Sequence, residues 1–197
     1  MGVNVKAKYL VWDTKIVPNA CVLDELKGVE ERWTLVKGVS QRSRFSSDAT
    51  FHMNHEFPNN TVLIDSLQNI SMLIVGSARL VAFLRTRVST NLEFLPVAIA
   101  NHKKKIISRD YSIIHPTDPV DCLDMTKSAP RWSTIDKETI NKVKMLVIDE
   151  KKVDPTRSLF RPRSFFRVVL VKRELAEAID AEGFTGIEWL ELENYGQ

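Results

Sequence analysis

Residues 165–192 contain the pattern that most restricts how this chain can fold. The apolar run Val168–Val171 is rich in β-branched residues and short enough for one buried strand. Leu175 and Ile179 then follow at the spacing of one apolar helix face. Gly183 comes next, and glycine adopts the left-handed conformation that ends a helix without steric cost. A second apolar run follows the turn, so the segment predicts a strand, a helix and a second strand.

The same pattern occurs 95 residues earlier, without a gap. Leu73–Val75 corresponds to Val168–Leu170, and Thr90–Leu95 corresponds to Thr185–Leu190. Only a few positions match closely, so two interpretations stay open. The two halves share an ancestor, or any two strand–helix–strand units look alike at this level of detail. In either case two such units, at about 62–99 and 157–192, frame the predicted core.

Strands outnumber helices along the chain, and the helices are too few to cover both faces of a parallel sheet. We therefore predict an α+β fold with a single mixed, mainly antiparallel β-sheet and helices packed on one face. Residues 1–60 are predicted to form a strand-containing N-terminal extension packed on a core domain, residues 61–197. Further expected elements are strands at 7–12, 33–39, 62–65, 92–99, 106–114 and 144–148, a loop at 41–60, and helices from Ser77 to about Arg87 and at 136–141.

The composition is typical of a globular protein that can bury a real core. The chain has 197 residues, of which 44% are hydrophobic. We see no signal peptide, and no apolar run approaches the roughly 18 residues of a membrane span. Cys21 and Cys122 lie in different halves without C-x-x-C spacing, which suits a reducing compartment. The sequence thus predicts a cytoplasmic protein without a membrane partner.

The charge distribution says more than the net charge of +3. Residues 151–173 hold eight Lys and Arg against one acid, Asp154, whereas residues 174–197 hold seven acids and no Lys or Arg. Either the two blocks lie side by side and neutralise each other, or the arginines form a surface that faces a partner.

No recognisable catalytic pattern is present. The sequence lacks the glycine-rich phosphate motifs and the G-x-S-x-G elbow. His52, His55 and Glu56 are the only clustered metal-ligand types, but they lack zincin spacing and lie in loop-like sequence, so ordinary surface histidines are the simpler reading. Four acidic residues could form carboxylate pairs or could cap backbone amides: Asp121, Asp124, Asp149 and Glu150.

Five segments follow one another in a characteristic order. They are Glu93–Val97, Val120–Asp124, Leu146–Glu150, Leu159–Arg161 and Glu174–Gly186. In this order and spacing they resemble the bacterial polymorphic-toxin immunity proteins of the family called immunity protein eleven. The resemblance covers most of the chain from about residue 60 onward. One departure is Lys172-Arg173, where the family pattern would have a serine-type helix cap.

The resemblance implies a non-enzymatic protein that binds and neutralises a cognate toxin, which we expect to be encoded by an adjacent gene. It implies no catalytic residues, no cofactor and no metal. Nucleic acid is not the expected partner, and a homodimer stays open. The alternatives are a small nucleic-acid-binding or regulatory module and, after it, an uncharacterised enzyme.

Interface residues cannot be carried over from relatives, because immunity proteins differ in their contacts. A slightly basic chain favours a neutral or acidic toxin surface. Tight binding also needs aromatic or arginine anchors, for which Trp132, Phe165 and Phe166 are candidates. The lysines at 103–105 could equally be a solvated hairpin tip. The predicted partner-binding residues are Lys103, Lys104, Lys105, Arg157, Arg161 and Arg163.

Overall fold

A computed structural model describes residues 7–89 and 91–196. Residues 1–6, Thr90 and Gln197, which belong to the predicted domains and to the predicted repeat, lie outside the described residues. The strands are β1 (Tyr9–Thr14), β2 (Leu23–Lys27), β3 (Thr50–Met53), β4 (Ser66–Leu67), β5 (Ile74–Ser77), β6 (Leu92–Ala100), β7 (Ile106–Pro116), β8 (Arg131–Trp132), β9 (Ile140–Lys142), β10 (Leu159–Phe160), β11 (Leu170–Lys172) and β12 (Ile187–Glu191). The helices are α1 (Trp33–Val36), α2 (Ala78–Arg87), α3 (Met125–Ser128) and α4 (Arg173–Ala181), with short 3₁₀ turns at Glu150–Lys152 and Leu192–Asn194.

The described strands form three sheets. A six-stranded sheet has the order β2-β3-β6-β7-β5-β4, a four-stranded sheet has the order β10-β11-β1-β12, and β8 pairs with β9. Only β3 and β6 pair in parallel among the described strands. The predicted α+β class, mixed and mainly antiparallel, is confirmed, but the strands divide among three sheets instead of one.

Both predicted strand–helix–strand units are present, and each one straddles an antiparallel strand. In the first unit β7 lies between β5 and β6 and is antiparallel to both. In the second unit β1 lies between β11 and β12 in the same way. The two outer strands of each unit are therefore parallel and joined by a helix, α2 or α4. The shared topology parallels the sequence match between the halves.

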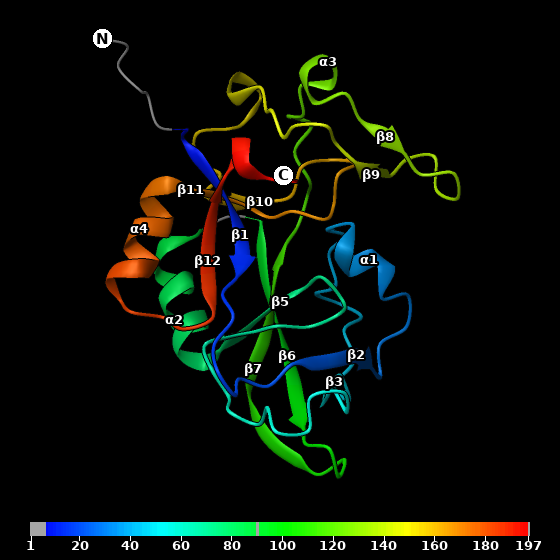
Figure 1. The fold of residues 1–197 in the computed structure, drawn as a ribbon, viewed down its shortest axis with the longest axis vertical. Helices are drawn as coiled ribbons and strands as arrows, with labels where there is room; N and C mark the ends of the chain where they lie inside the picture. The colour runs from blue at the N-terminus through cyan, green and yellow to red at the C-terminus, as the bar shows by residue number, and fades with distance from the viewer. Residues whose placement is uncertain (1–6, 90, 197) are drawn as a thin grey trace.

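The two helices belong to a core that the two large sheets share. Leu80 and Leu84 of α2 join the same buried cluster as Leu175 and Ile179 of α4. That cluster also contains side chains from both large sheets, so the helices share one core with strands of both units (Figure 1). Each sheet has its own second apolar cluster as well.

The local signals at the helix ends are confirmed. The Ser77 hydroxyl oxygen accepts a hydrogen bond from the Leu80 N–H at 3.3 Å and caps α2. Gly183 follows α4 with a φ of +67°. Lys172, at the N-cap of α4, makes no side-chain capping bond, which agrees with the departure from the family pattern.

The prediction of a strand at 33–39 is wrong, because Trp33–Val36 form the short helix α1. Its buried residues are the neighbours Thr34 and Leu35, a pattern that alternation does not produce. Trp33 and Val39 are 57% and 41% exposed, whereas Leu35 is fully buried. The strand was predicted because Trp33, Leu35 and Val39 fall on one side of an alternating pattern, but the fold leaves two of these three residues in solvent.

Four other predictions also need correction. The 41–60 loop contains β3, which bridges β2 and β6. The expected strands at 62–65 and 144–148 are reduced to single bridges at Val62 and Ile148. The expected helix at 136–141 is a turn that leads into β9, because the Asp136 carboxylate accepts hydrogen bonds from the Glu138 amide and the Thr139 hydroxyl and closes the turn locally. In such a short polar segment, local side-chain hydrogen bonds determine the backbone conformation more than helix propensity does.

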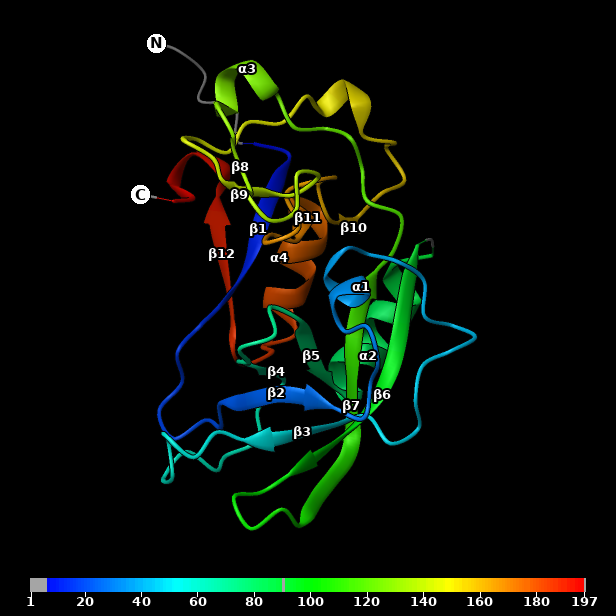
Figure 2. The same cartoon turned by 90° about the vertical axis from the view of Figure 1, so that its right-hand side faces the viewer.

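The predicted extension supplies central strands. β1 lies in the middle of the four-stranded sheet, whereas β2 and β3 extend the six-stranded one (Figure 2). The division into two parts at residue 60 stays a prediction. No helix within the described ranges has the length and apolar character needed to cross a bilayer.

Candidate functional site

The predicted lysines lie at the exposed tip of the β6–β7 hairpin. The Asn101 side-chain oxygen accepts hydrogen bonds from the Lys103 and Lys105 amides at 3.0 and 3.1 Å and shapes the turn. Lys104 adopts a φ of +60° within it. Among the described residues these three lysines form no ion pair, so their charges face solvent.

Two of the predicted arginines are engaged at the opposite end of β7. Arg157 forms an ion pair with Asp118 at 2.6 Å and donates to the Thr117 carbonyl at 3.2 Å. Arg163 is exposed and donates to the Pro119 carbonyl at 3.4 Å. β7 has 11 residues, which at about 3.4 Å each separates the arginines from the lysine tip by roughly 35 Å. The structure therefore does not bring the predicted cations together (Figure 1).

Arg161 corrects the prediction of a surface contact, because its side chain is buried. It is 2% exposed, and its guanidinium donates to the carbonyls of Phe166 at 2.5 Å and Met72 at 3.1 Å. Burial lowers its pKa to about 10. The side chain acts inside the protein as a clamp between the β4–β5 turn and the segment before β11.

The anchor candidates also differ in burial. Phe165 is 1% exposed and belongs to the core, Phe166 is half-buried, and Trp132 is 42% exposed on β8. The basic and acidic blocks are partly neutralised by each other: Arg173 pairs with Glu191 at 2.7 Å, whereas Arg163 forms no ion pair among the described residues. Mutual neutralisation thus holds for part of the segment, whereas a partner-facing role for the exposed arginines stays a prediction.

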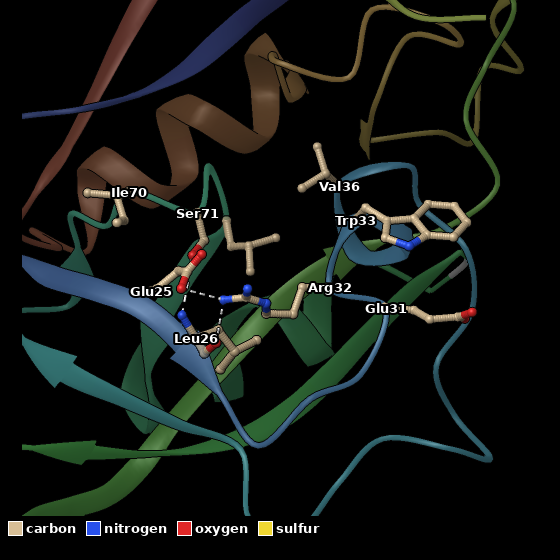
Figure 3. A pocket seen from close by; sticks show the side chains of 9 residues that line it. Glu25, Leu26, Glu31, Arg32, Trp33, Val36, Ile70 and Ser71 are labelled. Carbon is tan, nitrogen blue, oxygen red and sulfur yellow. Dashed lines mark hydrogen bonds and ion pairs between the residues drawn. The ribbon is translucent and has the colours of Figure 1, made fainter. Parts of the chain in front are cut away.

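The sequence did not indicate a hollow that lies beside α1. Its volume is about 530 Å³. Trp33 from α1 and Ile70 from the β4–β5 turn stand on opposite sides of it (Figure 3) and are 57% and 56% exposed. The lining residues are Glu25, Leu26, Glu31, Arg32, Trp33, Val36, Ile70, Ser71 and Leu73.

The charges in the hollow compensate one another. Arg32 lies 2.9 Å from the Glu25 carboxylate and donates to the Leu26 carbonyl at 2.9 Å (Figure 3). Hydrogen bonds from Arg32 and then Lys27 lower the pKa of Glu25. The apolar rim side chains, together with a neutralised floor, suit the docking of a partner's apolar or aromatic side chain.

The position of Trp33 is fixed from a distant segment. The Lys37 ammonium lies 5.3 Å from the centre of the Trp33 ring and pairs with Asp136 at 2.7 Å. The α1 turn is thereby held against the loop between β8 and β9. The position of this tryptophan directly after the charged run Glu30-Glu31-Arg32 was the one available sequence signal for an exposed aromatic residue.

The groups considered for chemistry have structural roles where the structure describes them. Asp124 and Asp149 accept hydrogen bonds from the Lys127 and Lys151 amides at 3.0 and 3.1 Å and cap short turns. Burial raises the pKa of both cysteine thiols to about 12, which opposes thiolate formation. The described residues contain no group of three or more His, Cys, Asp or Glu placed to hold a metal ion. His55 instead packs edge-on against His102, with ring centres 5.5 Å apart.

Comparison with known proteins identifies one family. A family model described as an immunity protein family (Imm11) matches residues 15–194, nearly the whole chain. No curated protein matches the chain.

Proposed function

Because the chain belongs to the Imm11 immunity protein family, we propose that it binds a cognate bacterial toxin and neutralises it by direct contact. The observation that carries the proposal is the family match over residues 15–194. The hollow beside α1, with its exposed tryptophan and isoleucine, supports it as a place where a toxin side chain could be buried. The proposal includes a toxin encoded by an adjacent gene, action in the cytoplasm and no enzymatic activity of the chain itself.

Co-expression tests this function. The chain is produced together with the product of the adjacent gene, and growth and direct binding are both measured. Rescue of growth together with nanomolar binding is the expected result. Absence of both rescue and binding would contradict the proposal, and so would rescue by the chain without any complex.

Replacing Trp33 with alanine is expected to weaken toxin binding at least tenfold, or about 1.4 kcal/mol. Truncation removes the largest exposed aromatic surface beside the hollow. Stability should change little, because more than half of the Trp33 side chain is already in solvent. Calorimetric titration against the toxin and thermal unfolding give the two values. Phe57→Ala, at an exposed aromatic residue outside the hollow that is 43% exposed, is the matched control and should bind normally. Equal loss in both variants would argue against the α1 hollow as the centre of the interface.

The exposed cations of the sequence prediction are expected to contribute less. Replacing Lys103, Lys104, Lys105 and Arg163 together with alanine should lower the association rate several-fold at low salt and leave the dissociation rate within about threefold. Solvated charges at opposite ends of β7 can steer a partner but cannot form one desolvated anchor. Stopped-flow association at two salt concentrations measures the effect. A large rise in the dissociation rate would instead place these residues at the centre of the interface.

A further inference from the structure

The first half of β6 has an open edge. β3 pairs with β6 only at Ala98–Ala100, and β7 occupies the other side along the length of the strand. On the side away from β7, residues 92–96 border a second hollow of about 520 Å³. Five consecutive residues of one strand line that hollow, which a sheet face cannot provide because alternate side chains point away from it. Figure 2 shows the loop after α1 passing beside this side of β6.

Two prolines determine which backbone groups face the open edge. Pro96 pairs with Ser112, and Pro116 pairs with Leu92. A proline has no N–H, so both pairs occupy non-hydrogen-bonded positions of the β6–β7 ladder. The N–H and C=O groups of even-numbered β6 residues therefore point away from β7. The Ala98 N–H, which bonds the Ala49 carbonyl at 2.9 Å on that side, agrees with this alternation.

The edge thus offers Phe94 and Leu92 as donors and acceptors, and Pro96 as an acceptor. Among the described residues, no loop or side-chain group bonds the Phe94 N–H or C=O on the open side. Unpaired groups in a row along a strand are a template for one further strand. The open stretch accommodates a segment of about five residues, because β3 pairs with the same edge of β6 from Ala98 onward.

The two cations that line the hollow stand on opposite faces of the sheet. Arg85 belongs to α2 and lies 4.5 Å from the centre of the Phe94 ring. Arg42 belongs to the loop on the other face, where the neighbouring Phe45 packs into the second cluster. Neither arginine has an ion pair among the described residues. The one acid in the lining, Glu93, is buried and already accepts bonds from Ser40 at 2.5 Å and from the Gln41 amide at 2.8 Å.

We propose that an extended acidic segment of the cognate toxin binds at residues 92–96 as an added β-strand, with its carboxylates on Arg42 and Arg85. This inference rests on the proposed function and names the chemistry of the partner. Successive side chains of an added strand point to opposite faces, so acidic residues on both faces meet one arginine each. A third hollow, about 280 Å³ in volume, lies between the β6 edge and the α1 hollow. It shares Ser46 with the hollow at the β6 edge and Glu31 with the α1 hollow. Both sites can therefore belong to one continuous interface.

Amide hydrogen exchange at single-residue resolution tests the edge. In the free protein the Phe94 amide should exchange rapidly, whereas the Leu95 amide, which faces Ile113 across the ladder, should be protected. Adding the toxin domain encoded by the adjacent gene should slow exchange at Leu92 and Phe94 at least tenfold and leave Leu95 unchanged. Equal protection of Phe94 and Leu95 in the free protein would overturn the proposal, and so would binding without new protection at Phe94.

Charge reversal gives an independent result. Arg42→Glu with Arg85→Glu should weaken toxin binding at least tenfold. Lys151→Glu with Lys152→Glu changes the net charge equally at two exposed lysines outside the hollow. The toxin affinity of this control should stay within threefold of wild type. Equal affinities of the two double variants would overturn the proposal while leaving the immunity function intact. If the toxin bound neither the variants nor the wild type, both the proposed immunity function and the proposed binding at residues 92–96 would be wrong.

Discussion

Replacing Arg161 with alanine is expected to lower the free energy of unfolding by about 3–5 kcal/mol. The side chain is 2% exposed, and its two terminal nitrogens hold the carbonyls of Phe166 and Met72. Alanine would leave two partly buried carbonyls without these donors and a cavity where the long, buried side chain packed. Urea unfolding monitored by tryptophan fluorescence measures the loss.

Two further variants separate charge from packing. Arg161→Met fills most of the volume without a charge, so its loss should be smaller than that of alanine. Arg163→Ala, at the exposed arginine two residues later, should stay within about 0.5 kcal/mol of wild type.

Burial lowers the pKa of His115, and the positive charge of Arg161 lowers it further. The methionine variant should therefore raise the pKa of His115 in an NMR titration. Wild-type stability of the alanine variant would show that the buried guanidinium is not a clamp.

The elements with strong local patterns could be predicted from the sequence. The helices at 78–87 and 173–181 carry apolar residues at helical spacing between a buried strand and a turn, and this information is complete within about 25 residues. The division into sheets depends on β1 pairing with β11 and β12, which lie more than 150 residues away. No local pattern encodes which distant strand completes a sheet.

The candidate site was harder to predict, because charge alone does not report burial. Arg161 and Arg163 flank one proline in the sequence, yet one is enclosed and the other is exposed. The apolar pair Leu159-Phe160 directly before Arg161 was the only hint that this arginine enters the core. Trp33 shows a second difficulty, since it was expected in a strand but belongs to a short helix and lies beside an open hollow. Open strand edges become visible only when the pairing of both neighbours is known.

Replacing Asp65 with asparagine is expected to cost about 2–4 kcal/mol at neutral pH. This carboxylate joins the two strand–helix–strand units. It accepts bonds from the Ser77 hydroxyl at 2.8 Å and Arg79 at 3.1 Å in the first unit, and from the Thr185 amide and hydroxyl, both at 3.0 Å, in the second. The side chain is 15% exposed, so water cannot replace these bonds fully. Equilibrium unfolding of both proteins gives the difference.

The pH dependence makes the Asp65 prediction specific. Burial by itself would raise the pKa of Asp65, but the hydrogen bonds from Arg79, Thr185 and Ser77 outweigh it and lower the pKa from 3.8 to about 2. A lowered carboxyl pKa stabilises the folded state above the unfolded value and loses that contribution as pH falls through the folded value. The shift corresponds to about 2 kcal/mol. The stability difference between wild type and Asp65→Asn should therefore shrink between about pH 4 and pH 2.

Asp136 provides the matched control for this effect. A hydrogen bond from Lys37 also lowers its pKa to about 2, but the Asp136 side chain is 39% exposed, so screening by water weakens the coupling. Asp136→Asn should thus change stability, and its pH dependence, much less than Asp65→Asn. The effect of Asp136→Asn should be limited to the position of α1, because the Lys37–Asp136 ion pair holds α1 near the β8–β9 loop. If the two variants showed the same acid profile, the junction at Asp65 would not be the link that holds the two units together.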